Sequence, residues 1–421
     1  MTQTCIVVGA GHAAAQLAPS LRQEGWEGNI LIISDEPYIP YHRPPLSKAL
    51  LAGEKNLSEI LIRPEAFYEK HNIHFRLSTR VESIQPTEKT ITLHDGEQLA
   101  YDKLALCTGS RVRKMPIGAG LAGVHYLRNI QDVEAIKADI HPHARAVIIG
   151  GGYIGLETAA VLKKLGLQVT VVEMMDRVLQ RVAASEVSEF YTRVHAEEGV
   201  RIETGKVVGA IEADPQAQTA HELTPRVLTP RVQQVLCTDN TRYDADLVII
   251  GVGVVPNTEL AETAGLAVDN GIVVDELART EDPHIVAAGD CTNHPNKLLG
   301  YRLRLESVPN ATDQAKTAAA SICGKQKPYC SLPWFWSDQY DMKLQIAGFN
   351  QGYDKVVLRG DNQTGRGFVA WYLRAGILLA ADCVNRPKEF MLAKQLLSKN
   401  LPVTPEQLAD ESFELKSLLR S

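Results

Sequence analysis

Two segments of the chain share one pattern, in which an apolar run leads into closely spaced glycines and then into a helix-forming stretch. The first reads "IVVGAGHAA" at 6–14, and the second reads "VIIGGGYIGLE" at 147–157. A further apolar run follows each predicted helix, at 29–34 and at 167–173. This order is a βαβ unit, which joins parallel strands through a right-handed crossover. The chain is therefore predicted to contain two parallel sheets, each with a glycine-rich turn.

The first turn has the glycine spacing of dinucleotide-binding folds. Gly9 permits a tight turn, Gly11 lets the backbone approach a pyrophosphate, and the small Ala14 allows close packing of helix and strand. The N-terminus of the following helix offers N–H groups and the positive end of a dipole. Asp35 and Glu36 follow the next strand, where an acid roughly twenty residues on accepts the ribose hydroxyls. We expect this turn to bind a nucleotide.

The second turn repeats the same chemistry, with Gly150, Gly152 and Gly155, and Glu173 closes the strand that follows. A carboxylate in that place hydrogen-bonds an unphosphorylated ribose and repels a 2′-phosphate. This favours NADH over NADPH. Arg177 leaves the preference open, because a nearby arginine can accommodate the phosphate.

The remaining segments complete two related halves and a smaller third part. Short alternating runs follow each βαβ unit, with a "DG" hairpin signal at 95–96 and a closing strand in "YDADLVIIGVG" at 243–253. The segment 212–234 contains "LTPRV" twice in tandem, which favours an exposed loop or a lengthened hairpin. From about 326, aromatic residues and alternating strand-like runs precede a predicted helix at 387–399. This last part is typical of an α+β domain with an antiparallel sheet.

The stretch "IVAAGD" at 285–290 resembles the second flavin signature of flavoproteins that have two dinucleotide-binding domains. In that signature the aspartate, here Asp290, holds the ribityl chain. The resemblance implies that the first domain resumes after the second is complete. The fold class is then α/β, with two Rossmann-like domains, the second inserted in the first, and a C-terminal α+β domain. The predicted boundaries are 1–112 and 243–325 for an FAD-binding domain, 113–242 for an NADH-binding domain, and 326–421 for the C-terminal domain.

Longer motifs make the resemblance specific. They are "PYHRPPLSKALL" (40–51), "GGGYIGLE", "AAGDC", "RLESVPNATDQA" (304–315) and "PWFWSDQYDMKLQIAG" (333–348). Nearly the whole chain resembles the bacterial FAD-dependent ferredoxin reductases of the putidaredoxin-reductase type, which serve cytochrome P450 and Rieske oxygenase systems. Rubredoxin reductases and the apoptosis-inducing factor are more distant relatives. The resemblance implies a glutathione-reductase-like fold and an oxidoreductase that uses FAD and NADH.

The resemblance also implies a set of site residues. Lys48 would lie beside the flavin N5 edge with Glu157 as its partner, so that a held cation stabilises the reduced ring. The residues alone also allow an ordinary surface ion pair. One ring among Trp334, Phe335 and Trp336 borders the flavin or packs the C-terminal domain, and we assign Trp334 to the cofactor. The implied flavin contacts are Ala13, Asp35, Lys48, Val81, Arg128, Asp290 and Val308. The predicted NADH contacts are Gly150, Gly152, Tyr153, Ile154, Gly155, Glu173 and Gly253.

The seven cysteines are scattered and form no zinc or disulfide pattern. None lies in 37–52, where related thiol-dependent enzymes carry their reactive cysteine, and Cys291 beside Asp290 is expected to pack in the core. Electrons must then pass directly to an external acceptor. The resemblance implies a small acidic [2Fe–2S] ferredoxin. Because the net charge is −6, docking needs a local basic patch, and the candidates are Lys297, Arg302, Arg304, Lys316 and Arg386.

Two other functions remain open at this point. A rubredoxin reductase differs only in its acceptor, and an apoptosis-inducing-factor-like protein would use FAD and NADH to control a binding surface. The acidic balance gives no overall attraction to nucleic acid or anionic membrane. No apolar run approaches the ~18 residues that span a bilayer. We expect a cytoplasmic protein, either a monomer or a weak dimer.

Overall fold

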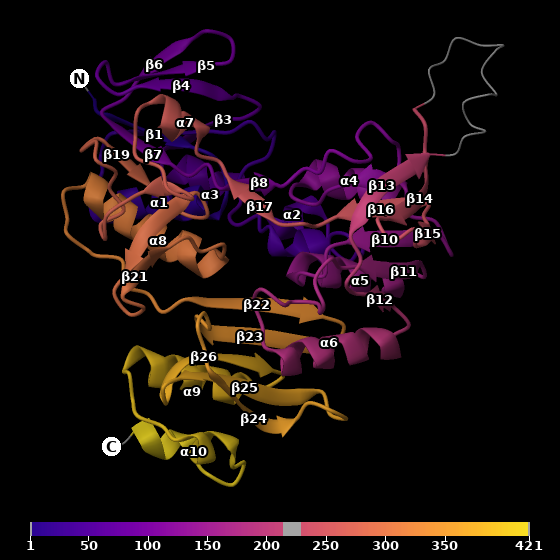
Figure 1. Cartoon of the computed structure of the whole chain (residues 1–421). Coiled ribbons are helices and arrows are strands. Elements are labelled where there is room, and N and C mark those ends of the chain that lie inside the picture. Colours follow the sequence, from indigo (N-terminus) through magenta and orange to yellow (C-terminus); the bar gives the residue numbers. More distant parts are fainter. Residues whose placement is uncertain (1, 214–228, 420–421) are drawn as a thin grey trace, which may run out of the picture. The chain divides into compact units, whose positions relative to one another are not determined.

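The computed structural model describes residues 2–213 and 229–419 (Figure 1). The chain forms two compact units. The first unit comprises Met1–His42, Asn56–Arg111 and Val255–Phe335. The second comprises Arg43–Lys55, Val112–Val254 and Trp336–Ser421. The finer division into three domains, with boundaries after residues 112, 242 and 325, stays a prediction.

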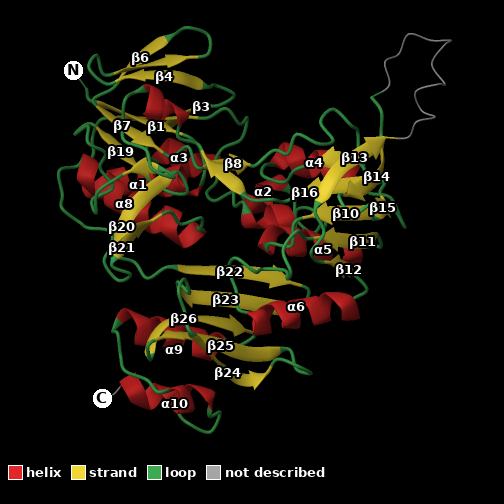
Figure 2. Cartoon of the chain, viewed as in Figure 1, coloured by secondary structure: helices red, strands yellow, loops and turns green. Residues whose placement is uncertain are grey.

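The first unit is built on a parallel five-stranded sheet in the order β19-β7-β1-β2-β3. Its strands are Ile285–Ala287, Lys103–Leu106, Thr4–Val8, Asn29–Ile33 and Ile73–Arg76. Helices α1 (His12–Glu24) and α8 (Val308–Ile322) pack against each other (Figure 2). Their small residues form one core with the middle strands, and this core includes Ala14, Leu17, Ala18, Ile30, Ile32, Ala315 and Ala319. The apolar strands are buried on both faces, as parallel strands require.

The second unit repeats this arrangement, with a parallel sheet in the order β12-β11-β10-β16-β9. Its strands are Arg201–Glu203, Gln168–Val172, Arg145–Ile149, Leu247–Ile250 and Val124–His125. Each sheet is accompanied by a three-stranded antiparallel meander. The first meander has β4 (Val81–Gln85), β5 (Thr90–Leu93) and β6 (Gln98–Ala100), and the second has β13 (Val208–Ala213), β14 (Val232–Cys237) and β15 (Arg242–Asp244). The predicted duplication is confirmed.

The first sheet takes its edge strand β19 from residues that follow the whole second sheet in sequence. The predicted insertion of one dinucleotide-binding fold into the other is therefore confirmed. The "DG" turn joins β5 to β6, with Gly96 at a φ of 85°. The tandem "LTPRV" segment connects the antiparallel strands β13 and β14, and its residues 214–228 lie outside the described part.

Further helices and strands lie between these elements in the sequence. They are η1 (Pro44–Ser47), α2 (Leu57–Ile60), α3 (Glu65–Lys70), β8 (Ser110–Val112), α4 (Ile130–Ala138), α5 (Tyr153–Lys164), α6 (Ser185–Glu197), β17 (Val254–Pro256), α7 (Glu259–Thr263), β18 (Ile272–Val273), β20 (Thr292–Asn296) and β21 (Tyr301–Leu303). Helix α5 opens directly from the second glycine turn and packs on β10 and β11. Within the described residues, none of the helices has the length and hydropathy that a bilayer crossing requires.

The C-terminal part forms the predicted antiparallel sheet, in the order β22-β23-β26-β25-β24. Its strands are Trp334–Gln339, Met342–Gly348, Ile377–Val384, Gly367–Arg374 and Lys355–Asp361. Helix α9 (Pro387–Ser398) packs on β23 and β26, and α10 (Pro405–Ala409) packs on β24. The chain ends with η3 (Leu415–Leu419) beside α9.

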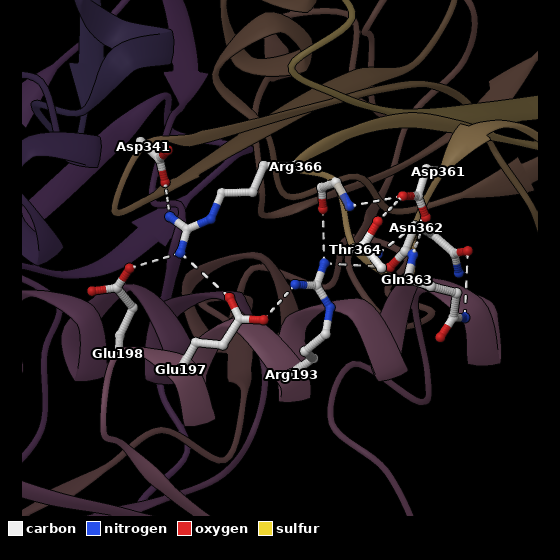
Figure 3. Close-up of polar contacts among 10 residues, drawn as sticks. Arg193, Glu197, Glu198, Asp341, Asp361, Asn362, Gln363, Thr364 and Arg366 are labelled. Carbon is white, nitrogen blue, oxygen red and sulfur yellow. Dashed lines mark hydrogen bonds and ion pairs between the residues drawn. The ribbon is translucent and has the colours of Figure 1, made fainter.

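A network of ion pairs joins helix α6 to this sheet (Figure 3). Arg366 forms ion pairs with Glu198, at 2.9 Å, and with Asp341. Glu197 forms an ion pair with Arg193 at 2.5 Å. Arg193 reaches on to the carbonyl of Gly365, at 2.8 Å. These side chains share a network of several charges, which holds its geometry better than isolated surface pairs do. The network fixes the β24–β25 hairpin to the helix.

Beneath the same helix lies a buried carboxyl group, Asp382 on β26. The hydroxyl of Tyr372 donates to its Oδ2 at 2.5 Å and accepts the N–H of Ala184 at 3.0 Å. Burial raises the pKa of Asp382 to about 7, although the Tyr372 hydrogen bond opposes the change. Asp382 therefore keeps its proton in the folded protein at pH values where the unfolded chain has lost it.

This protonation predicts a measurable pH dependence of stability. Between about pH 4 and pH 7 unfolding releases the proton of Asp382, so a rise in pH lowers the free energy of unfolding by about 1.4 kcal/mol per unit from this group. Asp382→Asn keeps the acceptor for Tyr372 and should remove that contribution. Urea unfolding at a series of pH values measures the free energy of unfolding of both proteins. Up to pH 7 this free energy should rise in the variant relative to the wild type, and above about pH 8 the difference between them should stay constant. If the free energy of unfolding changes equally with pH in both proteins below pH 7, the protonation of Asp382 is contradicted.

Candidate functional site

The first glycine turn fits a bound diphosphate. Gly9 has a φ of 102°, and a Cβ atom there would lie 2.3 Å from the carbonyl oxygen of Cys107. Gly11 caps α1 without any side-chain hydrogen bond, and a Cβ atom on it would meet nothing within 4 Å. The start of α1 therefore has no side-chain cap and has open space beside Gly11, and an uncapped helix N-terminus is an arrangement that binds phosphate oxygens.

Other predicted flavin contacts belong to the first unit. Gly289, just before Asp290, approaches so closely that a Cβ on it would lie 3.2 Å from the Cβ of Ala13. Ser110 donates to the Asp290 carboxylate at 3.0 Å. Asp35 is exposed two residues beyond the end of β2. The remaining contacts assigned to this unit begin three elements, namely β4 (Val81), α8 (Val308) and β22 (Trp334).

Two of the predicted flavin contacts, Lys48 and Arg128, belong to the second unit. Arg128 precedes α4, and its carbonyl oxygen accepts a hydrogen bond from Arg43 at 2.8 Å. The assignment of both residues to the flavin stays a prediction.

The second glycine turn repeats the geometry of the first. Gly150 has a φ of 111°, and a Cβ there would lie 2.4 Å from the carbonyl oxygen of Gly251. Gly155 packs so closely on the turn that its Cβ would lie 2.1 Å from the Gly150 carbonyl oxygen. Gly152 caps α5 without a side-chain hydrogen bond and has open space around it. This turn also fits a diphosphate.

The residues assigned to NADH differ in how far they are exposed to solvent. Ile154, the second residue of α5, is 47% exposed, whereas Tyr153 is only partly accessible. Gly253, beyond the end of β16, has a φ of 101° and open space at its Cβ position. A nucleotide could therefore contact Ile154 and Gly253 without displacing a packed side chain.

Glu173 is held beside the second turn by backbone amides. Its Oε2 accepts the N–H of Gly151 at 2.6 Å, and its Oε1 accepts the N–H of Met175 at 2.8 Å. The next side chain, Met174, is 63% exposed. Two amide donors fix the direction of the carboxylate, which suits a group that must receive a pair of ribose hydroxyls.

Lys48, which is partly exposed, pairs with the buried carboxylate of Glu157, so the alternative of an ordinary surface pair is wrong. Lys48 ends η1, and its Nζ lies 2.6 Å from Oε2 of Glu157, whose side chain is only 2% exposed. The hydroxyl of Ser47 donates to the same oxygen at 2.6 Å. The hydroxyl of Ser337, on β22, donates to Oε1 at 2.6 Å. Three donors satisfy the carboxylate, as a buried charge requires.

A chain of hydrogen bonds leads from Ser337 to three further side chains, Gln339, His195 and Tyr340. The Gln339 amide donates to the Ser337 hydroxyl at 3.2 Å, and its carbonyl oxygen lies 2.9 Å from Nε2 of His195. The Tyr340 hydroxyl lies 3.0 Å from Nδ1 of the same ring. Burial lowers the pKa of His195, so the ring is neutral. Its Nε2–H then donates to Gln339 while Nδ1 accepts from Tyr340.

Sequence reasoning missed these supporting residues. Ser47 lies within "PPLSK", and Ser337, Gln339 and Tyr340 lie within "PWFWSDQY". The motifs that carry the family resemblance thus contained a signal for four of them. His195 had no such signal, because nothing in the sequence of α6 indicates that it faces Gln339.

The structure also shows the state of the cysteines and the contacts of the basic residues that the sequence analysis named. All seven cysteines are free, and burial raises the pKa of Cys291, which makes that thiol a poor nucleophile. Four of the five basic candidates are engaged in local contacts, namely Arg304 with Glu306, Lys316 with Asp313, Arg386 with Glu411, and Arg302 with two backbone carbonyls. Lys297 is exposed and pairs with no other described residue. A basic docking patch stays a prediction.

Comparison with known proteins agrees with this geometry. The model of the family "pyridine nucleotide-disulphide oxidoreductase" matches residues 3–315, and that of "reductase C-terminal" matches residues 334–419. Putidaredoxin reductase of Pseudomonas putida is 43% identical over 98% of this chain and 96% of its own length. A rubredoxin-NAD(+) reductase of the same organism is 38% identical over 91% of this chain and 96% of its own length.

Solved structures give the same result. The covalent putidaredoxin reductase–putidaredoxin complex matches with a TM-score of 0.93 and 43% identity, over 99% of this chain and 98% of the other. The ferredoxin reductase for the CYP199A2 system of Rhodopseudomonas palustris matches with a TM-score of 0.92 and 40% identity, over 99% of both chains. The chain therefore belongs to the pyridine nucleotide-disulphide oxidoreductase family, among the ferredoxin reductases of the putidaredoxin-reductase type.

Proposed function

We propose that the protein is an FAD-dependent NADH:ferredoxin oxidoreductase that supplies electrons to an oxygenase. The observation that carries this proposal is the pair of glycine turns, each opening a helix whose first N–H groups have no side-chain cap. Two diphosphate sites in one chain suit one resident nucleotide and one that exchanges. The first turn, with Asp35 and Asp290 in the same unit, would hold FAD, and the second, with Glu173, would receive NADH.

The residues of the chain then have distinct roles. Glu173 would accept the ribose hydroxyls of NADH, since backbone amides already fix its direction. Lys48 would place a positive charge beside the flavin, and Glu157 would hold Lys48 in position through the 2.6 Å contact. FAD, when bound, supplies the conversion of one hydride into two single electrons. The described structure offers no reactive thiol beside Asp290, because Cys291 is buried.

The acceptor would be a small [2Fe–2S] ferredoxin. The proposal is supported by relatives named as reductases for oxygenase systems, among them a ferredoxin reductase subunit of a 5,5′-dehydrodivanillate O-demethylase from Sphingobium, which is 43% identical. The similarity to a rubredoxin-NAD(+) reductase makes rubredoxin the second candidate acceptor. We also infer a cytoplasmic location, where free cysteines stay reduced.

The decisive test is anaerobic titration of the purified protein with NADH, and with NADPH in parallel, followed by visible absorption. Bleaching of a bound flavin by about one equivalent of NADH, and weak response to NADPH, is the expected result, because Glu173 repels a 2′-phosphate. Reduction of a ferredoxin panel and a rubredoxin panel by the same sample then identifies the acceptor. Absence of flavin, or a flavin that NADH leaves oxidised, would favour a binding protein instead.

Substitution of the buried carboxylate tests the role of Lys48. Glu157→Gln keeps the size of the side chain but removes the charge that faces Lys48. The rate of flavin reduction by NADH, measured by stopped flow, should fall about 10- to 100-fold, because small misplacement of a catalytic group has effects of that order.

Glu54→Gln is the matched control for this substitution. It breaks an exposed ion pair with Lys164 and comes from the same segment, Arg43–Lys55, as Lys48. The rate of flavin reduction in this control should stay within about twofold of wild type, as surface pairs contribute little. If the rate of flavin reduction falls equally in both variants, Glu157 has no specific role in holding Lys48.

A further inference from the structure

The loop that follows Glu173 contains the arginine that the sequence left as a candidate phosphate ligand. In the structure the guanidinium of Arg177 is directed into its own loop. Its Nη1 donates to the carbonyl of Ala183 at 2.8 Å and to the hydroxyl of Ser188 at 2.6 Å. Its Nη2 donates to the carbonyl of Gln180 at 3.3 Å. The planar fork of the guanidinium is therefore occupied by local acceptors.

These contacts fasten the loop to helix α6. The backbone N–H of Arg177 donates to the side chain of Gln180 at 3.2 Å. Ser188, inside α6, uses its own hydrogen to donate to the carbonyl of Val178 at 2.6 Å. Arg177 and Ser188 together thus satisfy three backbone carbonyls of one short segment, Val178, Gln180 and Ala183.

The loop that Arg177 and Ser188 hold packs against the second glycine turn. Leu179 donates its N–H to the carbonyl of Gly151 at 2.9 Å and has a φ of 56°, a conformation that costs a leucine free energy unless its surroundings hold it. Val178 is fully buried against Gly151, where an added Cβ would lie 2.8 Å from the Val178 Cγ1. The N–H of that same Gly151 donates to Glu173 at 2.6 Å. A continuous set of contacts therefore runs from Arg177 to the carboxylate.

We propose that Arg177 is a positioning residue for Glu173, which strengthens the preference for NADH, and that it is not a ligand for the 2′-phosphate of NADPH. The inference rests on the proposed binding of NADH at the second turn. The charges on the loop agree with it, since Asp176 is exposed next to Arg177 and adds to the negative potential of Glu173.

The two possible roles of Arg177 predict opposite changes in nucleotide preference. In Arg177→Ala the loop loses its fastening, so the affinity for NAD+ should fall about tenfold, the effect of one charge-assisted hydrogen bond. The affinity for NADP+ should change little, so the NAD+/NADP+ affinity ratio should fall. An arginine that binds the 2′-phosphate would give the reverse, a loss confined to NADP+ and a higher ratio. Calorimetric titration of the FAD-loaded protein with each nucleotide measures the ratio directly.

Further variants separate positioning from charge and from damage to the fold. Arg177→Lys keeps the charge without the fork and should lower the ratio as the alanine variant does. Ser188→Ala leaves Arg177 in place but removes one acceptor, and it should lower the ratio to a smaller extent. An unchanged ratio in both would overturn the proposal.

Arg181→Ala is the matched control for loss of positive charge. Arg181 is an exposed arginine four residues along the same loop, and it contacts no other described residue through a hydrogen bond or ion pair. The NAD+/NADP+ affinity ratio of this control variant should stay within about twofold of the wild-type ratio, since a solvated charge contributes little. A fall equal to that of Arg177→Ala would assign the effect to net charge and overturn positioning. Wild-type protein that binds neither nucleotide would instead refute the proposed function.

Discussion

The second unit depends on one buried carboxylate. Glu157 receives Lys48 and Ser47 from the end of η1 and Ser337 from β22, so three segments far apart in sequence meet at a single side chain. Removal of such a charge from water is unfavourable by several kcal/mol unless its donors are in place. The three donors can be in place only when η1, α5 and β22 are correctly packed. The same interaction therefore selects the packed arrangement of the unit and places the lysine on which the proposed chemistry relies.

The local geometry of both glycine turns could be predicted from sequence, because its causes lie within a few residues. Gly9 and Gly150 are required by backbone conformations and close approaches that other residues do not tolerate. Glu173 follows from its position at the end of a strand. The duplicated topology was also predictable, since each βαβ unit with its meander leaves the same order of apolar runs.

The supporting contacts could not be predicted, because they depend on long-range packing. His195 reaches Gln339 across 144 positions of sequence, and no local pattern indicates that approach. The basic candidates show the same limit in another form. Arg304 and Lys316 meet acids two and three residues away, and a count of charges does not say which of them pair. For Arg177, proximity to Glu173 suggested a phosphate ligand, whereas the direction of its side chain became evident only with α6 in place.

The insertion of one fold into the other has a consequence for biosynthesis. The parallel sheet of the second unit has all its strands once the chain has passed Ile250, whereas the first sheet lacks β19 until Ala287 has been made. During that interval the nascent chain carries β7 with one unpaired edge, and an open strand edge invites pairing with other chains. Of the two parallel sheets, the one that begins first is thus completed second, and its strand Lys103–Leu106 is the one that keeps an open edge on the nascent chain.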